Sequence, residues 1–151
     1  MGVCFSVIHF ACMWVIFSLL AAVAAALVAI FGKMGLKEVD STLATTLRAF
    51  VMAGLMLSVS LALGKFKGFS LHALQGKEWL YVFLAGLAGA ASWLFYFLAL
   101  KHGDASRVSA IDRTSIFLVV ILSVMFLGES FKWKSLIGAI LVVIGAIAIA
   151  W

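Results

Sequence analysis

The sequence predicts an all-α integral membrane protein, folded as a bundle of five transmembrane helices. Its mean hydropathy is +1.26, and 66% of its residues are hydrophobic, against about half in soluble domains. Charged residues make up 11% of the chain, whereas soluble domains average about 25%. The apolar residues form runs close to the roughly 20 residues that a helix needs to cross a bilayer. No run shows the ten-residue alternating pattern of barrel strands.

The first apolar run covers residues 1–32 and is too long for one span. As a helix it would extend about 48 Å, against a hydrocarbon core of about 30 Å. We therefore assign residues 13–32 to the first span. Residues 1–12 are then an N-terminal extension, which is either an interfacial segment or a product of start-codon choice. The membrane domain is residues 13–151.

Charged residues separate the other four spans. The second covers residues 41–63, the third 79–100, the fourth 108–127 and the fifth 135–151. The connections between the spans are short, which favours antiparallel neighbours in a compact bundle.

The loop charges barely favour one orientation of the chain. One side of the predicted bundle carries five basic residues: Lys65, Lys67, Lys77, Lys132 and Lys134. The other side carries four: Lys33, Lys37, Lys101 and Arg107. Orientation normally follows a clear excess of Lys and Arg on one side. We therefore expect either a dual orientation or a single, weakly biased one with the N-terminus inside. Because the positive charges are dispersed over loops, we predict no nucleic-acid partner.

Each predicted span has small or polar residues along one face at the helical period. Such faces allow close helix contact or adjoin protein and water rather than lipid. The faces of the first three spans consist of Ser18, Ala21, Ala25, Ala29 and Gly32; of Ser41, Thr45, Arg48, Met52 and Met56; and of Ala85, Gly89, Ser92, Trp93, Tyr96 and Ala99. The fourth span has Ser106, Ser109, Asp112, Arg113 and Ser123, and the fifth has Gly138 and Gly145 beside Ala139, Ala146 and Ala150. The two glycines suit close contact within a subunit or across a dimer.

Three charged side chains fall within the predicted spans: Arg48, Asp112 and Arg113. A charge at membrane depth costs about 2.5–3.5 kcal/mol unless it is paired, near the interface or facing water. Asp112 and Arg113 are adjacent, so they do not face each other squarely, and Arg48 is the natural partner for Asp112. Three interpretations remain open: an interfacial position, a structural ion pair, and a substrate or proton site.

Two aromatic residues of the third span, Trp93 and Tyr96, lie on its small-residue face with Ser92. They are either an aromatic core contact or a wall that stacks against a flat or amphipathic ligand. The predicted substrate site combines this face with the charges of the second and fourth spans: Ser92, Trp93, Tyr96, Arg48, Asp112 and Arg113.

Motifs for catalysis or metal binding are missing from the sequence. The histidines are scattered, and there is no HExxH, no GxSxG and no Gly-rich phosphate loop. Cys4 and Cys12 have neither metal-ligand nor disulfide spacing. We therefore predict no enzymatic activity, no cofactor and no metal.

Several segments resemble a known family. DASRVSAID, FLGES and GAILVVIGAIAI are similar to the C-terminal half of an EamA domain, the repeat of the drug/metabolite transporter superfamily. AIFGKMGLKEVDSTLATTLRA resembles its first two helices, and SWLFYFLALKHGDASRVS its third-to-fourth junction. The resemblance covers about residues 13–151. Larger members carry two such repeats in inverted orientation, whereas this chain has one. It therefore resembles the single-repeat, five-helix bacterial and archaeal type, which implies the inner membrane of a prokaryote.

Two departures limit what the resemblance implies. Many EamA repeats have a proline in the fourth helix, where this chain has Ser115 or its neighbours. Without any proline, a bend has to use glycine, serine or a π-bulge. The small multidrug exporters of the superfamily use a glutamate in the first helix, and this chain has no acid there. Their proton-coupling scheme is therefore not implied.

The resemblance implies a transporter, and specifically an exporter, of small organic metabolites or amphipathic compounds that works by alternating access. Together with the near-equal loop charges, it predicts an antiparallel homodimer in the lipid bilayer, because inverted repeats place the substrate at their interface. The alternative is a non-transporting membrane subunit, or a half-transporter that needs a different partner chain.

Overall fold

The computed structural model describes residues 2–36, 39–67 and 76–151, with the backbone alone for residues 2–12. Its helices are α1 (Gly2–Gly35), α2 (Ser41–Ala62), α3 (Lys77–His102), α4 (Ala105–Asp112), α5 (Ser115–Leu127) and α6 (Trp133–Ala150). Five stretches are long and apolar enough to cross a membrane, with α4 and α5 together forming the fourth. The all-α, five-span prediction is therefore confirmed.

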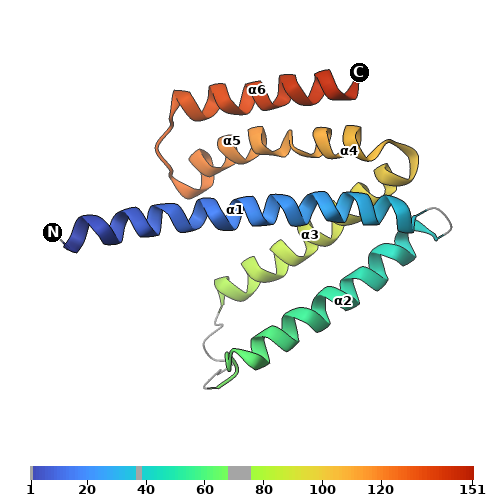
Figure 1. Ribbon diagram of the computed structural model, residues 1–151, viewed down its shortest axis with the longest axis horizontal. Helices are drawn as coiled ribbons and strands as arrows, with labels where there is room; N and C mark the ends of the chain where they lie inside the picture. Colours follow the sequence, from blue (N-terminus) through green and yellow to red (C-terminus); the bar gives the residue numbers. More distant parts are fainter. Residues whose placement is uncertain (1, 37–38, 68–75) are drawn as a thin grey trace.

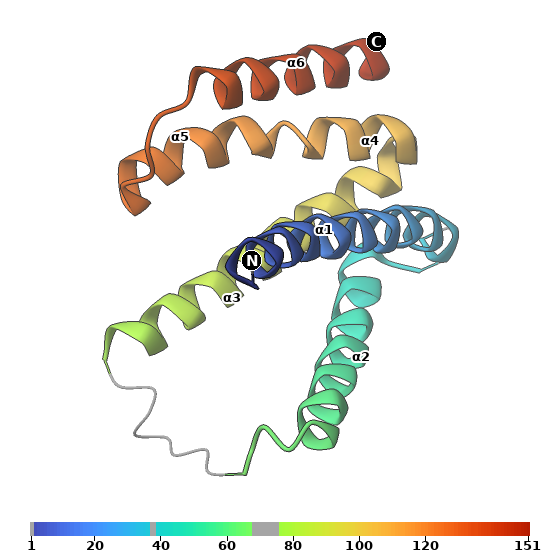
Figure 2. The same cartoon turned by 60° about the vertical axis from the view of Figure 1, so that its left-hand side comes forward.

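The helix α1 runs through the middle of the molecule (Figure 1). The helices α2 and α3 lie on one side of it, and α4, α5 and α6 lie on the other (Figure 2). α3 crosses α1 and leads into α4, while α6 packs along α4 and α5. The two termini lie at opposite ends of the molecule, as five spans require (Figure 1).

Polar side chains close the helix ends beside the first connection. Asp40 is the N-cap of α2 and accepts hydrogen bonds from the backbone N–H groups of Thr42 at 2.8 Å and Leu43 at 3.3 Å. These bonds satisfy donors that have no partner inside the helix. At the end of α3, Lys33 Nζ of α1 donates to the carbonyl oxygens of Leu100 at 2.6 Å and Gly103 at 2.8 Å. The lysine thus links α1 to the C-terminus of α3.

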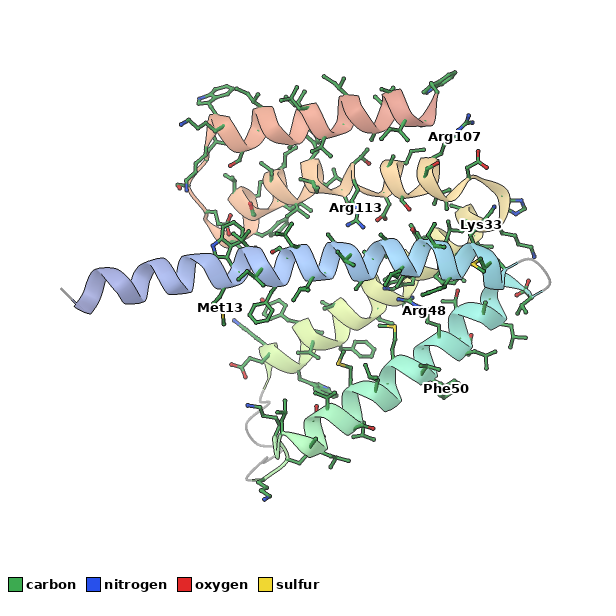
Figure 3. All side chains as sticks on the ribbon, viewed as in Figure 1. Met13, Lys33, Arg48, Phe50, Arg107 and Arg113 are labelled. Carbon is green, nitrogen blue, oxygen red and sulfur yellow. The ribbon has the colours of Figure 1, made fainter. Side chains whose placement is uncertain are left out.

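The buried core is small and lies where α1 crosses α3. Leu36, Phe97 and Leu100 form it. A side chain at Gly32 would place a Cβ atom only 3.3 Å from the Phe97 ring, so the glycine permits this close crossing. Large apolar residues elsewhere point outward, such as Phe50 at 72% exposed (Figure 3). This is expected where lipid, not a protein core, covers the apolar surface.

The helix α6 packs through its alanines. Ala139 and Ala146 are 2% and 4% exposed, and α6 contacts α4 and α5. In contrast, a Cβ atom at Gly138 or Gly145 would meet nothing within 4 Å among the described residues. The contact within the chain is therefore made by the alanine face, and the glycine face remains open.

The fourth span is broken between α4 and α5. The N–H groups of Thr114, Ile116 and Phe117 each donate three residues back, at 2.9–3.1 Å. The Thr114 hydroxyl donates to the Ile111 carbonyl at 2.7 Å. The break is therefore a short 3₁₀-type turn supported by a threonine side chain. The expectation of a bend at glycine, serine or a π-bulge was wrong, because the break is a 3₁₀-type turn at Thr114.

Candidate functional site

Five of the six predicted site residues meet at one cavity. It has a volume of about 60 Å³ and is lined by Ser92, Trp93, Tyr96, Asp112, Arg113 and Ala25. α3 supplies the first three residues, the end of α4 supplies the charged pair, and α1 supplies the alanine. The third and fourth spans therefore present their predicted polar faces to each other, with the small face of α1 beside them.

The aromatic side chains of α3 form one cluster. Trp93 and Tyr96 meet edge to face, with ring centroids 5.6 Å apart. The centroid of each of these rings also lies 6.2 Å from that of the Phe97 ring. The Tyr96 hydroxyl and the Ser109 hydroxyl of α4 are hydrogen-bonded at 2.9 Å. The interpretation of Trp93 and Tyr96 as an aromatic core contact is thus supported, yet both remain partly exposed and still line the cavity.

The sixth predicted residue, Arg48, does not line this cavity and instead contacts Trp93. Its guanidinium carbon is 3.5 Å from the centroid of the Trp93 ring system and 5.4 Å from that of Phe97. This is a cation–π contact, since the charge lies over the negative face of the ring. The predicted ion pair between Arg48 and Asp112 was therefore wrong: among the described residues the salt bridges are Lys101–Asp40 and Arg107–Asp104, and Arg48 contacts Trp93 instead.

Arg48 lines a much larger pocket between α2 and α3. This pocket has a volume of about 590 Å³. Its lining consists of Thr42, Thr45, Thr46, Arg48, Ala49, Met52, Ala85, Gly86, Gly89, Ala90, Trp93 and Leu94. Trp93 lines both this pocket and the small cavity. The predicted site residues therefore line two compartments, the small cavity and the α2–α3 pocket, and the indole of Trp93 forms part of the wall of both.

Asp112 and Arg113 lie at the break in the fourth span. Arg113 points from the junction of α4 and α5 toward α1 (Figure 3) and lines a further pocket with Ala22 and Ala25. It follows Ala105, the first residue of the span, by eight positions, or about 12 Å of helix. This depth within the span disfavours a purely interfacial position. The side chains of Asp112 and Arg113 are both exposed in the single chain. In the described part of the chain, the ion pairs are Lys101–Asp40 and Arg107–Asp104, both near helix ends.

Sequence reasoning missed two residues that organise the site. Phe97 is 4% exposed and supports both Trp93 and Tyr96. Its position four residues after Trp93 is the signal that would have placed it beside the tryptophan on one helix face. Lys33 fixes the end of α3, and a lysine in the last turn of the first span carries no sign of its distant partner.

Comparisons with known proteins identify the family of the chain. The EamA-like transporter family matches residues 12–151. The chain belongs to this EamA-like transporter family. A protein of Sinorhizobium sp. described as an uncharacterized transporter in the cobO 3′ region is 39% identical over 137 residues. The alignment covers 91% of this EamA-like chain and 96% of that protein. No solved structure matches the chain.

Family membership and the five spans establish a multi-pass membrane protein of a transporter family. The family of the earlier sequence resemblance is thereby confirmed. The site residues, the antiparallel dimer and the boundary between residues 12 and 13 stay predictions.

Proposed function

We propose that this chain exports small organic metabolites or amphipathic compounds across the inner membrane of a prokaryote by alternating access. The observation that carries the proposal is the cavity at the break in the fourth span, where Ser92, Trp93, Tyr96, Asp112 and Arg113 converge. Transporters build substrate sites at interrupted membrane helices, because the interruption exposes backbone groups and tolerates charge. Polar, aromatic and charged groups from two spans supply the contacts that such a site needs.

The size of this cavity supports a second copy as part of the working assembly. At about 60 Å³ it is far smaller than the roughly 300–1,000 Å³ of sites for drug-sized ligands. A compound bound at this cavity therefore requires the helices to move apart or another chain to complete the site. Two copies in opposite orientation would rebuild the inverted repeats of larger transporters. The near-equal loop charges favour such pairing, because neither orientation is strongly preferred.

Transport itself is tested with purified protein in liposomes. The liposomes would be loaded with a mixture of amino acids and 2-naphthoate, and efflux would be followed by mass spectrometry. We expect efflux of at least one compound well above that of protein-free liposomes. Efflux equal to that of protein-free liposomes for every compound would contradict the transport proposal.

The antiparallel pair is tested by the location of the C-terminus. A cysteine placed after Trp151 would be labelled with an impermeant thiol reagent in intact and then opened cells, with Cys4 and Cys12 replaced by alanine. Labelling of about half the molecules from outside is the expected result for a pair with equal numbers of each orientation. Labelling from one side alone would refute self-pairing in opposite orientations.

A single orientation would favour a half-transporter or a non-transporting subunit that assembles with a different chain. One observation supports this second candidate. The face of α6 at Gly138 and Gly145 has nothing within 4 Å of either Cβ position among the described residues, so it is open to another helix. Purification of a second small hydrophobic protein with this chain would distinguish this candidate from the homodimer.

A further inference from the structure

The pocket between α2 and α3 is large enough to hold a ligand without movement of the helices. Its volume of about 590 Å³ lies within the roughly 300–1,000 Å³ of sites for drug-sized compounds. The cavity beside Asp112 and Arg113 is about a tenth of that size, at about 60 Å³. Trp93 lines both, and Arg48, which contacts its ring, lines the larger pocket.

The charge in this pocket is of one sign. Of the described residues that line it, Arg48 is the one ionisable side chain. Three threonines contribute hydroxyl groups, and the other lining residues are apolar or glycine. A cation at membrane depth is costly unless an anion or water balances it. The pocket therefore favours a ligand with a negative group and an apolar body.

The position of Arg48 leaves its hydrogen-bond donors available. The guanidinium carbon is 3.5 Å from the centroid of the Trp93 ring system, so one planar face of the group is in contact with the indole. A face contact does not use the N–H donors, which project from the edge in the plane of the group. The salt bridges found between described residues, Lys101–Asp40 and Arg107–Asp104, do not involve Arg48. A carboxylate can therefore be bound by two parallel N–H···O bonds.

The threonines define what else the pocket offers. The Thr45 hydroxyl donates to the Ser41 carbonyl at 2.7 Å, and the Thr46 hydroxyl donates to the Thr42 carbonyl at 2.8 Å. Their oxygens therefore remain as hydrogen-bond acceptors, not donors, for a ligand. Arg48 is therefore the charged donor that the described lining residues offer to a negative group. A positively charged ligand would meet Arg48 without a carboxylate among the described lining residues.

We propose that the α2–α3 pocket binds amphipathic organic anions, with the Arg48 guanidinium, held flat against Trp93, binding the carboxylate. This inference rests on the proposed transport function and names its substrate class. Trp93 then has a second role as the wall between the anion pocket and the cavity at the break in the fourth span.

The test compares three probes that share one aromatic body. Binding of 2-naphthoate, 2-naphthamide and 2-naphthylmethylammonium would be measured by equilibrium dialysis against the full chain in phosphatidylcholine nanodiscs. We expect 2-naphthoate to bind at least about tenfold more tightly than the neutral amide, because hydrogen bonds between two charged groups are stronger than those to a neutral group. Equal affinities for the acid and the amide, or tighter binding of the ammonium, would overturn the proposal. This comparison needs no variant.

Variants then locate the binding group. Arg48→Gln should remove the preference for the acid, and Arg48→Lys should retain part of it, because lysine keeps the charge but lacks the planar fork. The matched control is Arg107→Gln, which removes an exposed arginine that pairs with Asp104 outside the pocket. It should leave all three affinities unchanged. A preference that survives in Arg48→Gln, or is lost in Arg107→Gln, would contradict the assignment.

An anionic lipid headgroup would satisfy the same chemistry as a free organic anion. Nanodiscs in which about a third of the lipid is phosphatidylglycerol distinguish these sources. Unchanged affinity for 2-naphthoate supports a free organic anion, whereas a large loss of affinity assigns the pocket to lipid and refutes the substrate class. The efflux assay remains separate. Acid-selective binding without efflux would contradict the transport function alone, and efflux of cations or neutral compounds without acid-selective binding would contradict this inference alone.

Discussion

The helices α1 and α6 both pack through small residues, but they meet different kinds of surface. α6 buries Ala139 and Ala146 against α4 and α5. α1 instead meets an aromatic ring at Gly32 and donates hydrogen bonds from Lys33 to the end of α3. Alanine packing ties α6 to its neighbours through close contact alone. The α1–α3 crossing adds directional bonds, which fix the position and rotation of α3.

The α6 contact supports the overall fold, whereas the α1–α3 crossing positions the helix that carries much of the site. α3 carries Ser92, Trp93 and Tyr96, so whatever fixes α3 also fixes the wall shared by the two compartments. The helix α6 packs against α4 and α5, the helices on either side of the charged pair Asp112 and Arg113. We therefore expect substitutions on α3 to affect transport first, and substitutions at helix contacts to affect stability first.

The largest effect should follow the loss of the shared wall. Trp93→Ala removes the surface that holds Arg48 and one side of the small cavity. We expect it to lower the efflux rate by at least about tenfold, because a displaced contact in a positioned site costs up to about 100-fold. Membrane insertion should be intact. Efflux from liposomes and the yield of folded protein measure the two quantities.

The control for Trp93→Ala lies on α6. Gly138→Ala adds a methyl group where nothing lies within 4 Å among the described residues, so both transport and yield should match those of the parent chain. Normal efflux in Trp93→Ala would remove this residue from the site. Loss of efflux in Gly138→Ala would instead show that the open face of α6 has a partner.

The next effect tests the α1–α3 crossing directly. Gly32→Leu should destabilise the chain by about 1–3 kcal/mol, the usual cost of overpacking, because even its Cβ atom would lie 3.3 Å from the Phe97 ring. Gly35→Leu is the matched control on the same helix, since its Cβ position has nothing within 4 Å among the described residues. Unfolding in detergent would be followed by circular dichroism. Equal stability of the two variants would mean that the crossing is looser than described.

A smaller effect is expected from the hydrogen bonds of Lys33. Lys33→Met keeps much of the side-chain length but removes the donor to the Leu100 and Gly103 carbonyls. The expected loss of stability is about 1–2 kcal/mol, since a bond to a charged donor is worth about 1.5–3 kcal/mol and water can replace part of it. Lys134→Met, at an exposed position in α6, should have little effect. A loss of the same size in both variants would contradict a specific role for Lys33.

Much of this architecture could be predicted from the sequence, for physical reasons. A span must satisfy its backbone polar groups internally and face lipid, so apolar runs of helix length identify the five spans. The small residues Ala29, Gly32, Ala139 and Ala146 were identifiable by their helical spacing, and the structure places them at helix contacts. Helical spacing also singled out the polar residues that meet at the small cavity.

The remaining features depend on how helices rotate and cross, which one helical period does not determine. Arg48 and Asp112 share the chemistry of an ion pair, but Arg48 contacts Trp93 of α3, and Asp112 lines the small cavity without Arg48. The link from Lys33 to the end of α3 joins residues 67 and 70 positions apart. The break at Thr114 depends on a hydroxyl that donates to a carbonyl three residues back, and threonines elsewhere in helices make similar bonds without a break.

The smallest effect concerns the start of α2, where two aspartates offer a matched pair. Asp40 accepts hydrogen bonds from the first turn of α2, whereas Asp104 occupies the N-cap position of α4 without such a bond. Asp40→Ala should therefore speed hydrogen exchange at the Thr42 and Leu43 amides. Asp104→Ala should leave the amides of the first turn of α4 nearly unchanged.

The cap at Asp40 also depends on pH. The backbone N–H groups of Thr42 and Leu43 lower the pKa of Asp40, and the nearby charge of Lys101 lowers it further. Because the pKa in the folded state is below that in the unfolded chain, the carboxylate's contribution is complete above about pH 4 and lost as the pH falls through the lowered value. Protection of the Thr42 amide should therefore persist at pH values where an ordinary aspartate is already protonated. Loss of protection beginning well above pH 4 would show that Asp40 does not cap α2. In that case Lys33 would still join the end of α1 to α3, but the start of α2 would not be fixed by Asp40.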